Sequence, residues 1–142
     1  MKKILCSTGA LIGMPNNRDF SLIKKCVPNI NSDGFEFMMY STWYDKVHNL
    51  LKELKKCETE FPVMHCEKHI GEDLGKNADG NFYTAKEKFK VNCEIANEIG
   101  AKRMVMHLWD GIYSDITIEN NIKGYGELIK IAEENEIDLH IE

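Results

Sequence analysis

Residues 62–71 read PVMHCEKHIG, in which a short apolar run leads into two histidines, a cysteine and a glutamate. Imidazole, thiolate and carboxylate groups are the usual protein ligands of zinc and other divalent metals. His107 follows a second apolar run, KRMVMHLW, in a similar way. Metal binding is one interpretation of these histidines, and a polar loop that happens to contain histidine is the other. The predicted secondary structure around these histidines helps to distinguish the two interpretations.

Hydrophobic periodicity divides the chain into alternating strand and helix patterns, with no linker or low-complexity segment. The predicted strands are KILCST from Lys3, GFEFMMY from Gly34, PVMHCE from Pro62, KRMVMHLW from Lys102 and IDLHIE from Ile137. Apolar stripes at helical spacing lie between them, at Val47/Leu50/Leu51/Leu54, Phe82/Ala85/Phe89/Cys93/Ala96 and Ile122/Tyr125/Leu128/Ile129/Ala132. This alternation predicts a parallel sheet with right-handed crossovers.

The ends of two helices can also be predicted. A first helix is expected from about Asp19 to Cys26, because Pro28 cannot continue it. Gly100 falls where the C-terminal cap of a helix belongs, just before the fourth strand.

The two faces of the predicted strands differ in polarity. In KRMVMHLW, Met104, Met106 and Leu108 share one face, and His107 shares the other with its neighbours Val105 and Trp109. A βα-barrel requires an outer face packed on helices and an inner face that turns polar toward the C-terminal ends of the strands. An open doubly wound sheet would make its central strands apolar on both faces. The pattern favours the barrel.

A complete eight-stranded barrel takes roughly 250 residues. This chain has 142 residues and supplies about five strands and four helices. We therefore expect residues 1–142 to form a single α/β domain, an incomplete (β/α)8 TIM barrel. Its first and fifth strands would lack the partners that barrel closure provides, and unpaired strand edges promote association. A homo-oligomer is expected for that reason.

Composition excludes several kinds of partner. The formal net charge is -5 and no block of Lys and Arg is present, so neither nucleic acid nor a membrane surface is expected as a partner. No segment approaches the ~20 apolar residues of a membrane span. The 5 cysteines are scattered without a CxxC pair, which favours reduced thiols and a cytoplasmic location.

The histidines have a structural interpretation beside the functional one. His65 and His107 could be hydrogen-bonded barrel histidines, but their shared position at the C-terminal ends of strands favours a site, because TIM barrels carry their active sites there. His69 lies four residues after His65, yet the segment reads as strand to loop. The helical two-histidine metal geometry therefore does not apply, and His69 is expected to be a loop residue.

Other polar and aromatic residues also have both a structural and a functional interpretation. Glu36 should point inward, either as a site residue or within an internal polar network. Cys66 should face the helices and pack there. Trp43, Tyr44 and Trp109 follow strands, where they could stack on the ring of a ligand or cover the core.

The strands also resemble a known family. NSDGFEFMMY resembles the second-strand GFDGVEL signature of the xylose isomerase-like TIM barrels, which include sugar-phosphate isomerases, epimerases and apurinic-site endonucleases. VMHCEKHIG resembles the third strand of that family and KRMVMHLW the fourth, each ending in histidine. LHIE resembles the fifth strand, which ends in a metal-binding glutamate. The chain thus resembles the N-terminal part of such a barrel.

The resemblance implies a set of site residues. Glu142 matches the shared glutamate, which would bind metal and act in catalysis. His65 and His107 match histidines that bind metal in the nuclease branch and line the substrate pocket in the isomerase branch. Glu36 and Trp109 are further candidates for substrate binding. The remaining ligands of the family would lie on later strands, beyond Glu142.

Departures from the family patterns distinguish its branches. The nuclease branch has Ala-Pro-Tyr after its third-strand histidine, whereas Cys66, Glu67 and Lys68 follow here. Its fourth-strand histidine runs into Pro-Gly, whereas Leu108 and Trp109 follow here. A nuclease also needs a positive surface for phosphates, and the net charge is negative. The isomerase branch is favoured, and the apurinic endonuclease-like phosphodiesterase is the alternative.

The function implied is metal-assisted proton transfer next to the carbonyl of a sugar or sugar phosphate, with Mn, Mg, Co or Zn as the metal. The chain alone is expected to bind metal weakly and to be inactive. A second alternative is a flavodoxin-like flavin-binding protein, because STGALIG after the first strand faintly resembles a flavodoxin phosphate loop. Strand order 1-2-3-4-5 would support the barrel, and order 2-1-3-4-5 would defeat it.

Overall fold

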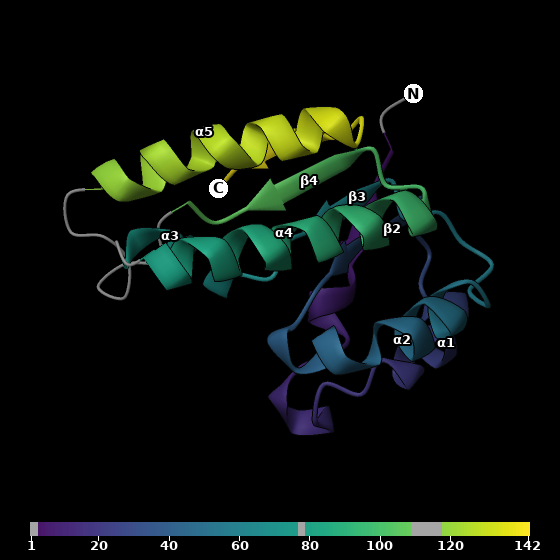
Figure 1. The fold of residues 1–142 in the computed structure, drawn as a ribbon. Helices are drawn as coiled ribbons and strands as arrows, with labels where there is room; N and C mark the ends of the chain where they lie inside the picture. Colours follow the sequence, from purple (N-terminus) through teal and green to yellow (C-terminus); the bar gives the residue numbers. More distant parts are fainter. Residues whose placement is uncertain (1–2, 77–78, 109–117) are drawn as a thin grey trace.

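The computed structural model describes residues 3–76, 79–108 and 118–142, and its strands form a single parallel sheet (Figure 1). Their order is β1-β2-β3-β4-β5, and each strand pairs in parallel with the next. The strands are β1 Leu5–Ser7, β2 Gly34–Met38, β3 Val63–His65, β4 Arg103–Met106 and β5 Asp138–Ile141. The predicted barrel order is confirmed, and the flavodoxin order is excluded.

Five α-helices are found among the described residues, where four were expected. They are α1 Ser21–Cys26, α2 Val47–Leu54, α3 His69–Gly75, α4 Asp79–Ile99 and α5 Glu119–Glu134. Short 3-10 turns cover Thr8–Ala10, Met14–Asn16, Val27–Asn29 and Ser41–Lys46. None of the described helices is long and apolar enough to cross a membrane.

The additional helix is α3, in the segment that was expected to be a loop. Its Ile70 and Leu74 stand four residues apart and are both buried, so they form one apolar contact on the face that packs on α4 and α5. His69 is therefore the first residue of a helix, and its prediction as a loop residue was wrong. Because His65 is still in a strand, the two do not form a helical histidine pair.

The helices cover one face of the sheet, with α1 beside α2, α2 beside α4 and α4 beside α5 (Figure 1). On that face the strands bury Phe35, Phe37, Met64, Met104 and Met106. The opposite face is open, since Val63 and Val105 are half-buried and Arg103, Asp138 and His140 are exposed. The predicted alternation of faces in the fourth strand is thus confirmed.

Helix ends follow the expected signals. Helix α1 ends at Cys26 and Pro28 lies in the 3-10 turn that follows it. Helix α4 ends at Ile99, and Gly100 adopts φ +79. The N–H of Ala101 donates to the Ala96 carbonyl at 2.8 Å, and the N–H of Gly100 donates to the Asn97 carbonyl at 3.2 Å. This pair of bonds is the Schellman cap, which requires the left-handed conformation that glycine adopts without strain.

The buried face of α5 differs in part from its predicted apolar stripe. Tyr125, Leu128 and Ala132 of α5 pack on the core as expected, but Ile122 is 57% exposed. The first turns of α5 instead bury Asn121 and Gly124 against the end of β4 and against α3. A polar and a small residue make this contact, and hydrophobic periodicity could not predict it.

Candidate metal centre

Three predicted site residues meet at the C-terminal edge of the sheet. His65 ends β3, His107 directly follows β4 and Glu142 directly follows β5. Their potential ligand atoms all lie within 4.8 Å of one another, and the two imidazole rings are 5.0 Å apart between centroids. The parallel register brings them together, because adjacent strands end at the same edge. The backbone N–H of Glu142 also donates to the Met106 carbonyl at 3.0 Å.

The hydrogen bonds of His65 constrain its protonation. Nδ1 lies 3.1 Å from the carbonyl oxygen of Cys66, which can only accept, so Nδ1 carries the hydrogen. Nε2 lies 3.0 Å from Oε2 of Glu142. In a neutral imidazole with hydrogen on Nδ1, the lone pair of Nε2 would face a carboxylate oxygen. This contact is favourable only if the ring is protonated or if a cation lies between the two atoms.

A divalent cation fits this set of donors. With metal–ligand bonds of about 2.1 Å, neighbouring ligand atoms around a tetrahedral ion lie about 3.4 Å apart. The ligand atoms here are at most 4.8 Å apart, so the side chains would move inward by about 1 Å to hold an ion. A backbone carbonyl that fixes the far nitrogen of a histidine is also the usual outer contact of a metal-bound imidazole.

The charge of Glu142 suits the same interpretation. The hydrogen bond from His65, then the charge of that ring and more weakly the charge of His107, lower the pKa of Glu142 below its ordinary value of 4.5. The side chain is 62% exposed while that of His65 is 7% exposed. Glu142 is therefore a carboxylate at neutral pH, and it stands on the open side of a buried imidazole.

The other two residues predicted to bind substrate are Glu36 and Trp109. Glu36 lies on β2 in register with Val63, two residues before His65, and its Oε1 accepts a hydrogen bond from Ser7 Oγ at 3.2 Å. This contact agrees with the internal polar network, and a role in substrate binding stays a prediction. Trp109 lies outside the described residues.

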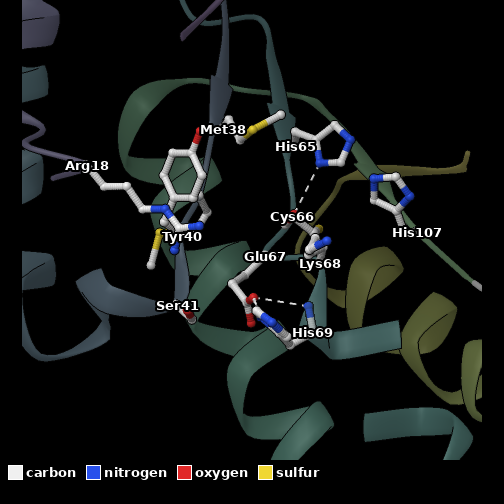
Figure 2. A pocket seen from close by; sticks show the side chains of 11 residues that line it. Arg18, Met38, Tyr40, Ser41, His65, Cys66, Glu67, Lys68, His69 and His107 are labelled. Atoms are coloured by element: carbon white, nitrogen blue, oxygen red, sulfur yellow. Dashed lines mark hydrogen bonds and ion pairs between the residues drawn. The ribbon is translucent and has the colours of Figure 1, made fainter. Parts of the chain in front are cut away.

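A pocket formed in part by the two histidines is also lined by residues that the sequence did not single out as site residues. Figure 2 shows the rings of His65 and His107 on one side of it, with Glu67, His69, Arg18 and Tyr40 on the others. The side chains of Glu67 and His69 are joined by a short contact between Oε1 and Nδ1. An acidic residue two positions after a strand that ends in histidine is the signal that could have indicated this arrangement.

Cys66, Trp43 and Tyr44 make contacts within the protein. Cys66 is buried against Met104, with 3.9 Å between the sulfur atoms, and burial raises the pKa of its thiol well above 9.0. Its predicted packing role is confirmed. Trp43 is 2% exposed and packs on Phe37, so it covers the core and cannot stack on a sugar. Tyr44 accepts a hydrogen bond from Asn92 at 2.9 Å.

Comparison of the fold with known structures gives a consistent set of relatives. The chain is similar to 3-keto-D-glucoside 4-epimerase YcjR from E. coli, with a TM-score of 0.66, 12% identity and coverage of 99% of this chain and 56% of the other. It is similar to a D-tagatose 3-epimerase-like protein, with a TM-score of 0.68, 18% identity and coverage of 99% and 52%. It is also similar to D-allulose 3-epimerase from Methylomonas sp., with a TM-score of 0.64, 13% identity and coverage of 99% and 52%.

No protein-family model matches the sequence, and no curated protein is similar to it. The chain spans about half the length of the solved structures that it matches. At these identities the likeness concerns the fold, and it confirms the resemblance expected from the strand motifs at that level. The chain therefore has the fold of a five-stranded part of a TIM barrel, as found in these two sugar epimerases and the epimerase-like protein.

Proposed function

We propose that this chain carries part of the active site of a metal-dependent sugar isomerase or epimerase, in which His65, His107 and Glu142 hold a divalent cation. The observation that carries the proposal is the convergence of these three residues at the C-terminal edge of the sheet. TIM barrels place their active sites at that edge. The similarity of the fold to two sugar epimerases and a D-tagatose 3-epimerase-like protein supports the same choice of reaction.

The residues have distinct roles in this proposal. A cation bound there would polarise the carbonyl oxygen of a sugar and so make the neighbouring C–H more acidic. His65 keeps Glu142 ionised at neutral pH, which is the form of the carboxyl group that can accept that proton. His65 is buried and held by the Cys66 carbonyl, which fixes the direction of its Nε2. The pocket beside the two histidines would receive the rest of the sugar.

Metal binding is the first test. Titration with Co²⁺ or Zn²⁺, followed by calorimetry and by the Co²⁺ absorption spectrum, should show one site. His65→Ala, His107→Ala and Glu142→Gln should each weaken binding at least tenfold, because each removes one ligand. His48 is an exposed histidine on α2, so His48→Ala is the matched control and should bind metal like the unaltered chain. Equal affinity in all variants would refute the proposed site.

Activity is the second test. Exchange of a sugar C–H with D₂O, followed by NMR with Mn, Mg, Co and Zn supplied in turn, detects proton transfer before any product accumulates. We expect these 142 residues to bind metal weakly and to show no appreciable turnover, because they span about half of the epimerases they resemble. Strong metal-dependent exchange that disappears in Glu142→Gln would show that five strands suffice. Cleavage of DNA at abasic sites would favour the nuclease alternative.

A further inference from the structure

The pocket beside His65 and His107 also contains polar residues that are not proposed metal ligands. Its volume is about 80 Å³, and Glu67, His69 and Arg18 form part of its wall (Figure 2). One water molecule takes a share of about 30 Å³ in the liquid, so this space suits one end of a ligand. A whole sugar would extend out of it toward the proposed metal ligands.

Glu67 is a buried carboxyl group with an incomplete set of hydrogen bonds. The residue is 2% exposed. Its Oε1 accepts from the backbone N–H of His69 at 3.0 Å and contacts the ring Nδ1 of His69. Its backbone N–H donates to Oδ1 of Asn92 at 3.2 Å. Its Oε2 has no partner among the described residues. Buried polar atoms nearly always have one, so this oxygen calls for a donor.

Arg18 contributes the opposite kind of atom to the same pocket. Its guanidinium carbon lies 4.8 Å from the centre of the Tyr40 ring, and Tyr40 is itself fixed by a hydrogen bond from its hydroxyl to the Ile12 carbonyl at 2.7 Å. Nε of Arg18 is buried and has no acceptor among the described residues. The wall of the pocket therefore includes two residues with an unused polar atom, an acceptor on Glu67 and a donor on Arg18, neither of which has a partner among the described residues.

We propose that Glu67 and Arg18 form a subsite for the hydroxylated, unphosphorylated end of a sugar, and this rests on the proposed function of the neighbouring metal centre. Hydroxyl groups both donate and accept, so they can satisfy Glu67 Oε2 and Arg18 Nε. A phosphate dianion offers only acceptors, so it could satisfy Arg18 Nε but has no hydrogen to donate to Glu67 Oε2. Both atoms are covered in this structure, so ligand hydroxyls would reach them only after these side chains rotate.

The test compares a sugar with its phosphate on the whole chain in the presence of Mg²⁺. D-Tagatose and D-tagatose 6-phosphate are titrated separately while amide NMR spectra are recorded. D-Tagatose should shift the amides of Glu67 and His69, and the phosphate should bind at least fivefold more weakly. Glu67→Gln and Arg18→Lys should each weaken binding of D-tagatose at least fivefold, since each alters one of the unused atoms while the spectrum reports folding. Glu58→Gln, at an exposed glutamate, is the matched control.

The outcomes separate this proposal from the proposed function. Tighter binding of the phosphate, unchanged affinity in both pocket variants, or no shift with D-tagatose would overturn the subsite. If both pocket variants lose D-tagatose while His107→Ala keeps its metal affinity, the subsite stands and the proposed metal centre fails. If the metal ligands behave as proposed and the pocket variants bind D-tagatose normally, the subsite alone fails.

Discussion

The backbone of Gly71 in α3 is pressed against the backbone of His107. A Cβ atom built on Gly71 would lie 2.2 Å from the carbonyl oxygen of His107 and 3.2 Å from its carbonyl carbon. Asn121 of α5 links the same two segments. Its Nδ2 donates to the Gly71 carbonyl at 2.8 Å and to the Leu108 carbonyl at 2.5 Å. The position of a proposed metal ligand therefore depends on how α3 and α5 pack at the end of β4.

Gly71→Ala should move His107. The new methyl group cannot avoid a rigid backbone oxygen, so either α3 or the end of β4 must shift, and overpacking of this kind costs about 1–3 kcal/mol. We expect a loss of that size in the free energy of unfolding, measured by urea denaturation, together with weaker Co²⁺ binding in the folded protein.

Gly126→Ala is the control for this substitution. Gly126 is an exposed residue in α5, and a Cβ there meets no atom within 4 Å. Alanine is favoured over glycine inside a helix by up to about 1 kcal/mol, so this variant should be at least as stable as the unaltered chain. If Gly71→Ala is as stable as Gly126→Ala and binds Co²⁺ equally well, α3 does not position His107.

Asn121→Ala should also destabilise the chain. It would leave two buried carbonyl groups, of Gly71 and Leu108, without their donor, and each buried unsatisfied group costs about 1–3 kcal/mol. The expected loss in the free energy of unfolding is about 2–4 kcal/mol after relaxation of the site. Asn97→Ala, at an exposed asparagine of α4, should change stability little. Thermal and urea denaturation of both variants would decide the matter.

The sheet could be predicted because the sequence signals that define it lie within each strand and helix. Alternating residues of β4 show which face meets the helices, and Gly100 marks the end of α4 within its own segment. Parallel strands in sequential order then bring His65 and His107 to one edge, whatever the details of the loops. The part of the site formed by strand ends followed from these rules.

The rest depends on contacts between distant segments. Helix α3 has only 7 residues, too few for a periodic pattern, and its position is set by Asn121, 50 residues away from Gly71. The burial of Glu67 depends on Asn92 in α4 in the same way. A glutamate and a histidine in a polar stretch read as a surface loop, since no local signal shows what covers them.

The buried thiols should resist both ionisation and labelling. Burial raises the pKa of Cys93 to about 12 and raises that of Cys66 well above 9.0. In the folded chain we expect a thiol reagent at pH 8 to label Cys6, Cys26 and Cys57 before these two, which should react only on unfolding. Rapid labelling of all 5 cysteines without loss of helical circular dichroism would contradict the packing described.

The same shifts give the chain a stability that depends on alkaline pH. A thiol whose folded pKa is raised favours the folded state fully below its unfolded pKa, near 9.0, and this contribution is lost as pH rises toward the folded value. Burial raises the pKa of Tyr44 as well, which adds to the effect above pH 10. The free energy of unfolding should therefore decline from pH 9 upward. Cys93→Ala should show a shallower decline, measured by urea denaturation at several pH values.

The last prediction concerns association through the outer strands. Ile4, just before β1, is 72% exposed, and Ile141 in β5 is 50% exposed, so each edge of the sheet carries apolar surface beside unpaired backbone groups. The open face between them adds half-buried Val63 and Val105. We predict concentration-dependent association in sedimentation velocity, weakened by Ile4→Lys and by Ile141→Lys because a charged side chain at an edge opposes pairing of strands. Ile122 is 57% exposed on α5, so Ile122→Lys should leave association unchanged. A monomer at every concentration, or equal weakening by all three substitutions, would show that the edges of the sheet do not mediate contact between copies of the chain.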